Sequence, residues 1–249
     1  MNRLRQKRIK EYIEERNEVS IRELQALFPE VSLMTIHRDL DTLEEGGSIV
    51  KFRGGARSVR YAGDPEFNVR IRENNAGKLV IARKALELLQ PNSAVFLDAS
   101  TTNLALARAL PDINLNVFTT GPSIALELCR LHNPVVTLCC GTINRKNLAV
   151  SGQNTLEMLE RINIDMAFIG VSGCSVEAGF TCGTEGDMLV KHKVIQKART
   201  SVVMCSREKL SCLMPYTFAM FSDVDYLITD APLPENFLRA VQESGVTVL

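Results

Sequence analysis

The sequence lacks a long apolar run. No stretch reaches the roughly 18 consecutive apolar residues that a membrane-spanning helix needs. The opening residues, MNRLRQKRIKEYIEER, are largely charged and lack the apolar core of a secretion signal. We therefore expect a cytoplasmic protein without membrane contact. The formal net charge of zero argues against a surface covered in basic charge, although a whole-chain sum can hide a local basic patch.

Signatures of a metal or cofactor site are missing as well. The seven cysteines are odd in number and include no C-x-x-C pair and no Cys/His spacing suited to zinc. Neither His132 nor His192 has neighbours in a catalytic pattern. We predict no metal, no cofactor and no catalytic residue, and we interpret most cysteines as small core residues.

The first part of the chain reads as three short helices. Residues 3–16 carry apolar side chains at helical spacing. Ser20 and Glu23 form a capping box before a second helix at residues 21–28, and Ser32 caps a third. Three short helices with a tight turn between the last two predict a helix-turn-helix.

A basic hairpin follows the third helix. The β-prone segments SIVKF and ARSVRYA are joined across a turn at Arg53, Gly54 and Gly55. The exposed positions of this hairpin carry Lys51, Arg53 and Arg57. A basic hairpin directly after a helix-turn-helix is typical of the wing of a winged-helix DNA-binding domain.

The third helix presents polar side chains opposite its apolar face. When Ile36 and Leu40 face the core, Arg38 lies on or beside the opposite face of the helix. There it can donate two hydrogen bonds to a guanine base or bind a phosphate. The alternative is a solvated helix face with a stray ion pair. Together with the hairpin, the pattern favours double-stranded DNA as a partner. The residues that we assign to DNA contact are Ser32, Thr35, His37, Arg38, Lys51, Arg53 and Arg57.

The second part of the chain has a different pattern. Residues 61–77 are rich in turn formers and predict a linker between a DNA-binding domain at 1–60 and a second domain at 78–249. In the second domain, short apolar runs alternate with helical stretches. Strands without polar alternation are buried on both faces, as in a parallel sheet covered by helices, so the fold class is α/β. Such sheets bind ligands at the carboxyl ends of their strands.

Polar residues follow several of these strands. Residues 98–102 read as a strand end, a hydroxyl-rich loop and a helix start, where amides, hydroxyls and the helix dipole can hold a phosphate. Equally, Thr102 or Asn103 can merely cap the helix, and Lys209 can be a surface lysine. The residues that we assign to a ligand site from this pattern are Asp98, Ser100, Thr101, Thr102, Thr119, Thr120, Gly141 and Lys209.

Several of these motifs resemble the DeoR family of bacterial transcriptional regulators. The stretch TIHRDL at residues 35–40 is similar to the family's T-I-R-R-D-L, and RGGA at 53–56 to its H-G-G-A. The resemblance covers the rest of the chain and implies a sugar-phosphate-binding domain similar in fold to ribose-5-phosphate isomerase. Asp187 and Lys191 stand where the family has a glutamate four residues before a lysine, so the resemblance adds both to the ligand site.

The resemblance implies a repressor of a carbohydrate-metabolism operon, controlled by a phosphorylated sugar or sugar alcohol. Because one winged helix covers a short half-site, we also expect a homo-oligomer. Two other functions stay open. A sugar-phosphate isomerase with a DNA-binding head would need a base such as Asp187 or Glu185, but residues 170–173 hold no acid, which favours sensing. A thiol-based redox regulator would need accessible cysteines.

Overall fold

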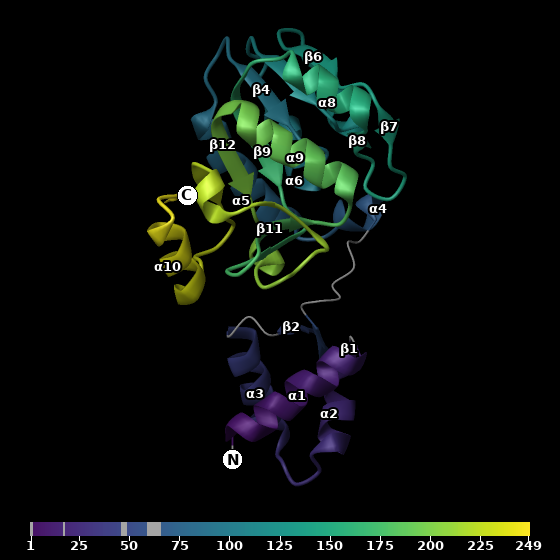
Figure 1. Ribbon diagram of the computed structural model, residues 1–249, viewed down its shortest axis with the longest axis vertical. Coiled ribbons are helices and arrows are strands. Elements are labelled where there is room, and N and C mark those ends of the chain that lie inside the picture. Colours follow the sequence, from purple (N-terminus) through teal and green to yellow (C-terminus); the bar gives the residue numbers. More distant parts are fainter. Residues whose placement is uncertain (1, 17, 46–48, 59–65) are drawn as a thin grey trace.

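A computed structural model describes residues 2–16, 18–45, 49–58 and 66–249. The chain forms a small N-terminal domain of helices with a short sheet, and a larger α/β domain (Figure 1). Within the described residues, every helix is too short or too polar to span a bilayer.

The predicted helix-turn-helix is present in the N-terminal domain. Its helices are α1 (Asn2–Arg16), α2 (Ile21–Leu27) and α3 (Leu33–Glu45). The capping box before α2 is confirmed, because the amide of Ser20 donates to the Glu23 carboxylate at 2.7 Å and the amide of Glu23 donates to Ser20 Oγ at 3.2 Å. Ser32 Oγ accepts from the Thr35 amide at 3.3 Å and so caps α3. The helices enclose a core that includes Ile13 and Leu40.

The predicted hairpin is also confirmed. Strands β2 (Ile49–Phe52) and β3 (Gly55–Ser58) pair antiparallel, with Phe52 opposite Gly55, so Arg53 and Gly54 form a two-residue turn. Gly54 has a φ of +105°, which favours glycine. A strand that the sequence did not predict, β1 (Glu18–Ser20), pairs with the other edge of β3. We call the β2–β3 hairpin the wing.

Part of the predicted linker is helical. Helix α4 (Phe67–Arg70) buries Phe67, whose amide donates to the carbonyl of Lys146 at 2.8 Å. Helix α5 (Asn75–Leu88) begins three residues before the predicted boundary at Lys78, because Asn74 caps it by accepting from the Gly77 amide at 3.1 Å. Residues 59–65 lie outside the described residues, and the domain boundaries at 60 and 78 stay predictions.

The C-terminal domain is built on a seven-stranded sheet in which every pairing is parallel. The apolar runs noted in the sequence form its strands. These are β4 (Ala94–Leu97), β5 (Asn116–Thr119), β6 (Val135–Leu138), β9 (Ile164–Gly170), β12 (Ala198–Met204), β14 (Tyr226–Ile228) and β15 (Thr247–Val248). Their order in the sheet is β15-β14-β12-β9-β4-β5-β6.

Helices cover both faces of this sheet. One face carries α5, α6 (Thr101–Ala109) and α7 (Pro122–Leu128), and the other carries α8 (Gln153–Glu160), α9 (Glu185–Lys197) and α10 (Glu235–Glu243). Five short strands and two 3-10 turns complete the domain. They are β7 (Thr142–Ile143), β8 (Val150–Ser151), β10 (Gly173–Ser175), β11 (Gly179–Cys182), β13 (Tyr216–Ala219), η2 (Arg207–Lys209) and η3 (Phe221–Asp223). Strands β10, β11 and β13 form a second, antiparallel sheet that the sequence did not predict.

The direction in which the main sheet grows reverses between β4 and β9. After β4 the chain adds β5 and β6 on one side, and then adds β9, β12, β14 and β15 on the other. Sheets of this kind bind ligands in the crevice at the carboxyl ends of the two strands where the order reverses. Asp98 directly follows β4 and Gly170 ends β9, so the topology places a candidate site between these two residues.

Candidate functional site

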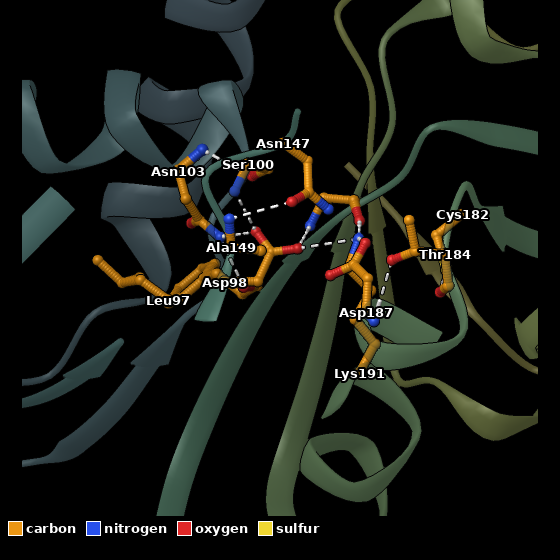
Figure 2. A network of polar contacts seen from close by, with 12 residues as sticks. Leu97, Asp98, Ser100, Asn103, Asn147, Ala149, Cys182, Thr184, Asp187 and Lys191 are labelled. Atoms are coloured by element: carbon orange, nitrogen blue, oxygen red, sulfur yellow. Dashed lines mark hydrogen bonds and ion pairs between the residues drawn. The ribbon is translucent and has the colours of Figure 1, made fainter. Parts of the chain in front are cut away.

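A small cleft lies at the carboxyl ends of β4 and β9. Its volume is about 10 Å³, which is room for about one water molecule, so a larger ligand requires side chains to move. The residues that line it are Arg70, Asp98, Ala99, Ser100, Asn147, Ala149, Gly170, Val171, Ser172, Asp187 and Lys191. Figure 2 shows the polar network around it, in which Lys191 and Asp187 reach toward Asp98.

Lys191 is the buried cation of this network. It extends from α9, and its Nζ lies 3.0 Å from Asp187 Oδ2 and 3.2 Å from Asp98 Oδ2. The same atom donates to the carbonyl of Gly170 at 2.8 Å. Burial alone would lower the pKa of Lys191, but the carboxylates of Asp187 and Asp98 outweigh it and raise the pKa above its ordinary value. Lys191 therefore stays charged.

Asp98 links the ends of the two strands. Its Oδ1 accepts from the amide of Ser100 at 3.0 Å and from Asn103 Nδ2 at 2.7 Å, while Oδ2 accepts from the amide of Gly170 at 3.0 Å. Asn103 Nδ2 also donates to the carbonyl of Phe168 at 2.7 Å. One carboxylate thus holds the first turn of α6 and the end of β9 in fixed positions.

The first turn of α6 closes one side of the cleft. Ser100 is its cap, because Ser100 Oγ accepts from the Asn103 amide at 3.1 Å. The amides of Thr101 and Thr102 occupy the first helical positions, where the helix itself offers no acceptor. A Cβ on Gly170 would lie 2.4 Å from Ser100 Cβ, so only glycine lets β9 approach this turn so closely. The turn presents amides and the positive end of the helix dipole.

The predicted DNA-contacting residues differ in how accessible they are. Ser32, which caps α3, and Arg38 on that helix are exposed, and Thr35 and His37 beside them are partly exposed. Arg53 is exposed at the wing turn. Lys51 and Arg57 are only partly exposed, and the ammonium of Lys51 pairs with Asp41. A buried neighbour in the same helix, Asp39, accepts from Gln6 Nε2 at 3.1 Å and pairs with Arg5, which fastens α3 to α1.

Comparison with protein families decides the relationship of the chain. Residues 5–61 match the DeoR-like helix-turn-helix domain, and residues 73–231 match the DeoR C-terminal sensor domain. The chain belongs to the DeoR family. It is therefore a transcriptional regulator with a winged helix-turn-helix domain and a sensor domain.

Individual DeoR-family relatives match over nearly the whole chain. The HTH-type transcriptional regulator GlpR of Haloferax volcanii is 34% identical, over 88% of this chain and 86% of the relative. The HTH-type transcriptional repressor GlcR of Bacillus subtilis is 30% identical, over 97% and 93%. Among solved structures, ribose 5-phosphate isomerase A from Methanocaldococcus jannaschii aligns with a TM-score of 0.41 and 17% identity over 55% of each chain.

The structure brings together four of the predicted ligand-site residues in the DeoR sensor domain. Asp98, Ser100, Asp187 and Lys191 line the cleft, and Thr101 begins the adjoining helix turn. Neither Thr102 nor Asn103 caps α6, as the alternative interpretation suggested. Ser100 is the cap, and the same residue lines the cleft.

The other predicted residues lie apart from the lining of the cleft. Thr119 Oγ1 donates to the carbonyl of Leu97 at 2.7 Å, which ties β5 to β4. Thr120 is buried next to it, and Gly141 lies where a Cβ would come within 2.3 Å of Thr155 Oγ1. Lys209 lies in η2, close enough to the buried Lys78 for its charge to help lower the pKa of Lys78, after the larger effect of burial.

Three cleft residues with polar or charged side chains were not assigned to the site from the sequence. Arg70 comes from α4, and Asn147 comes from a loop whose Lys146 carbonyl accepts a hydrogen bond from the first residue of α4. Neither segment has a periodic pattern that would indicate its position. Ser172 lies after β9 in residues 170–173, which the sequence pattern places at the ligand edge of the sheet without assigning Ser172 itself to the site.

Proposed function

We propose that the chain represses a carbohydrate-metabolism operon and that a phosphorylated sugar or sugar alcohol, bound in the cleft between β4 and β9, controls its affinity for operator DNA. The observation that supports this most directly is the polar cleft at the sheet's reversal point, in the same chain as a winged helix. Family membership supplies the regulatory role.

The cleft's charges favour a ligand with two chemically different ends. Lys191 and Arg70 balance Asp98 and Asp187, so the charged side chains that line the cleft sum to a formal charge of 2 − 2 = 0. The two carboxylates beside Lys191 suit sugar hydroxyls as donors and disfavour a phosphate next to them. The first turn of α6 offers the amides and hydroxyls of Thr101 and Thr102 and the positive end of the helix, which suits a phosphate. The cleft's small volume means that the ligand must displace part of the Lys191 network.

We infer that the ligand is bound without being converted. Aldose–ketose isomerisation needs a carboxylate that is available to take a proton from carbon. Asp98 and Asp187 are both engaged by Lys191, and residues 170–173 contribute no acid. The same proposal includes a homo-oligomer acting in the cytoplasm, because two half-sites must be read together for useful affinity.

The DNA-binding part of the proposal is tested by selecting binding sites from random duplex DNA. We expect one enriched motif. Arg38→Ala should then weaken specific binding by about 1–3 kcal/mol if Arg38 reads a base, whereas Lys51→Ala should weaken binding to all sequences and reduce the salt slope by about one. Failure to enrich any motif would contradict the proposal.

The ligand part is tested by calorimetry with a panel of sugar phosphates and sugar-alcohol phosphates. Thr101→Ala should weaken binding, and Thr119→Ala, a buried threonine away from the cleft lining, is the matched control. In gel shifts the bound compound should change operator affinity about 5–150-fold, which corresponds to a coupling of about 1–3 kcal/mol. Equal binding to both variants would show that the phosphate site is wrongly placed, and conversion of the compound would establish an enzyme.

A further inference from the structure

The wing contacts the sensor domain through an apolar patch. Val50 of β2 packs against Cys212 and Met214, which are only 2% and 5% exposed. Figure 1 shows β2 on the side of the DNA-binding domain that faces the sensor domain. Val50 does not belong to the helical core of its own domain, which is built around other residues such as Ile49. Its packing partners thus lie in the other domain.

This contact turns part of the wing toward the sensor domain. A groove of about 1490 Å³ runs between the domains, and Lys51 and Arg57 are among the residues that line it. The C-terminal half of α3 contributes Asp41 and Glu44 to the same groove, whereas the predicted contacts in the first half of α3 do not line it. The observed arrangement therefore directs two of the predicted wing contacts into the groove between the domains and leaves the start of α3 outside it.

The segment that contains Cys212 is packed against strand β10, which follows the cleft residue Ser172 in the chain. Ser172 lines the cleft, and at the next position, Gly173, a Cβ would lie 2.5 Å from the carbonyl oxygen of Cys212. Cys174 forms a parallel β-bridge with Leu210. A movement of the cleft loop is thus passed to Cys212 within one residue, because there is no space between the two backbones to absorb it.

We propose that residues 210–214 form a docking surface for the wing, that docking lowers operator affinity by holding Lys51 and Arg57 in the groove between the domains, and that the cleft ligand acts by shifting the balance between docked and undocked wings. The ligand can do so only to the extent that it binds the two arrangements with different affinity. The inference rests on the proposed function. It holds that ligand binding affects the DNA-binding domain through the packing contact at Val50, in addition to the chain connection at residues 61–77.

A disulfide trap tests whether the wing docks. Val50→Cys introduces a thiol beside the native Cys212, and mild aerobic oxidation removes two electrons and two protons from the pair to join them. We expect peptide mass mapping to find positions 50 and 212 linked within one chain. Val135→Cys, at an exposed valine of the sensor domain, is the matched control and should form no such link. A link only between two chains, or none at all, would overturn intramolecular docking.

The functional consequence is measured on operator DNA selected with the wild-type protein. The oxidised Val50→Cys protein should bind this DNA about tenfold more weakly, because two of the predicted DNA-contacting side chains are held in the groove, and a reducing agent should restore binding. Val50→Ser, which weakens docking without a crosslink, should bind more tightly than wild type, and Val135→Ser should not. If the oxidised and reduced proteins bind alike, the inference is wrong; if wild type selects no DNA, the proposed function has failed instead.

Discussion

Replacing Lys191 by methionine should destabilise the sensor domain strongly. The substitution keeps the length of the side chain and removes the charge that lies 3.0 Å from Asp187 Oδ2 and 3.2 Å from Asp98 Oδ2. Asp98 retains its three hydrogen-bond donors, but the two carboxylates lose their shared counter-ion at a site where Asp98 is 1% exposed. Breaking a buried ion pair in this way costs about 3–5 kcal/mol.

Urea denaturation followed by circular dichroism measures this loss. Lys193→Met is the control on the same helix, because Lys193 pairs with Glu160 at the surface, where such a pair is worth at most about 1 kcal/mol. Adding Asp187→Asn to Lys191→Met should recover part of the loss, since it removes one of the two stranded charges. If Lys191→Met is no less stable than Lys193→Met, Lys191 is not the counter-ion that holds the cleft together.

The pH dependence of this loss has a definite sign. The pKa of Lys191 is raised in the folded protein, so its contribution is fully present below the unfolded pKa of about 10.4 and disappears as the pH rises through the higher folded value. The wild type should therefore lose this stabilisation only in strongly alkaline solution.

Three further predictions concern other parts of the molecule. Burial, with a smaller effect from Cys140, raises the pKa of Cys139 to about 11, so iodoacetamide at pH 8 should alkylate Cys139 far more slowly than the exposed Cys129, as mass spectrometry can measure. Light scattering should show a dimer or larger oligomer; a monomer that binds its operator tightly at every concentration would contradict this. Asp39→Asn should loosen α3 from α1 by about 1–3 kcal/mol and lower the temperature at which operator binding is lost, whereas Asp41→Asn at the surface should not.

The DNA-binding domain was predictable because its signals are local. A capping box needs only Ser20 and Glu23 at the right spacing, and the helix it starts follows from those two residues. The parallel strands were predictable for a related reason, since a strand buried on both faces is a continuous apolar run. Strand β1 was missed because three residues contain no periodicity, and its strand character comes from pairing with β3.

The cleft was only partly predictable because its residues become important through tertiary packing. An aspartate four residues before a lysine on a helix is the ordinary pattern of a surface ion pair, and nothing in it indicates that Lys191 is buried. That burial is decided by β9, whose Gly170 carbonyl receives the ammonium. The position of Arg70 also depends on a tertiary contact, because a backbone hydrogen bond between Phe67 and Lys146 holds α4 at the cleft.

For the proposed ligand site, the small volume of the cleft favours sensing over catalysis. A catalytic site gains from groups already placed for the transition state, so that binding causes little rearrangement. Here the cavity of about 10 Å³ and the bridged carboxylates mean that the proposed ligand would have to replace a contact of Lys191 or Asp98 with one of its hydroxyls. Because Asp98 also holds the amide of Gly170, that replacement alters the end of β9, and three residues later Gly173 meets Cys212 beneath the wing. A ligand-controlled regulator needs a ligand that binds two arrangements of the protein with different affinity. A cleft that has to rearrange before it can hold the ligand provides two such arrangements.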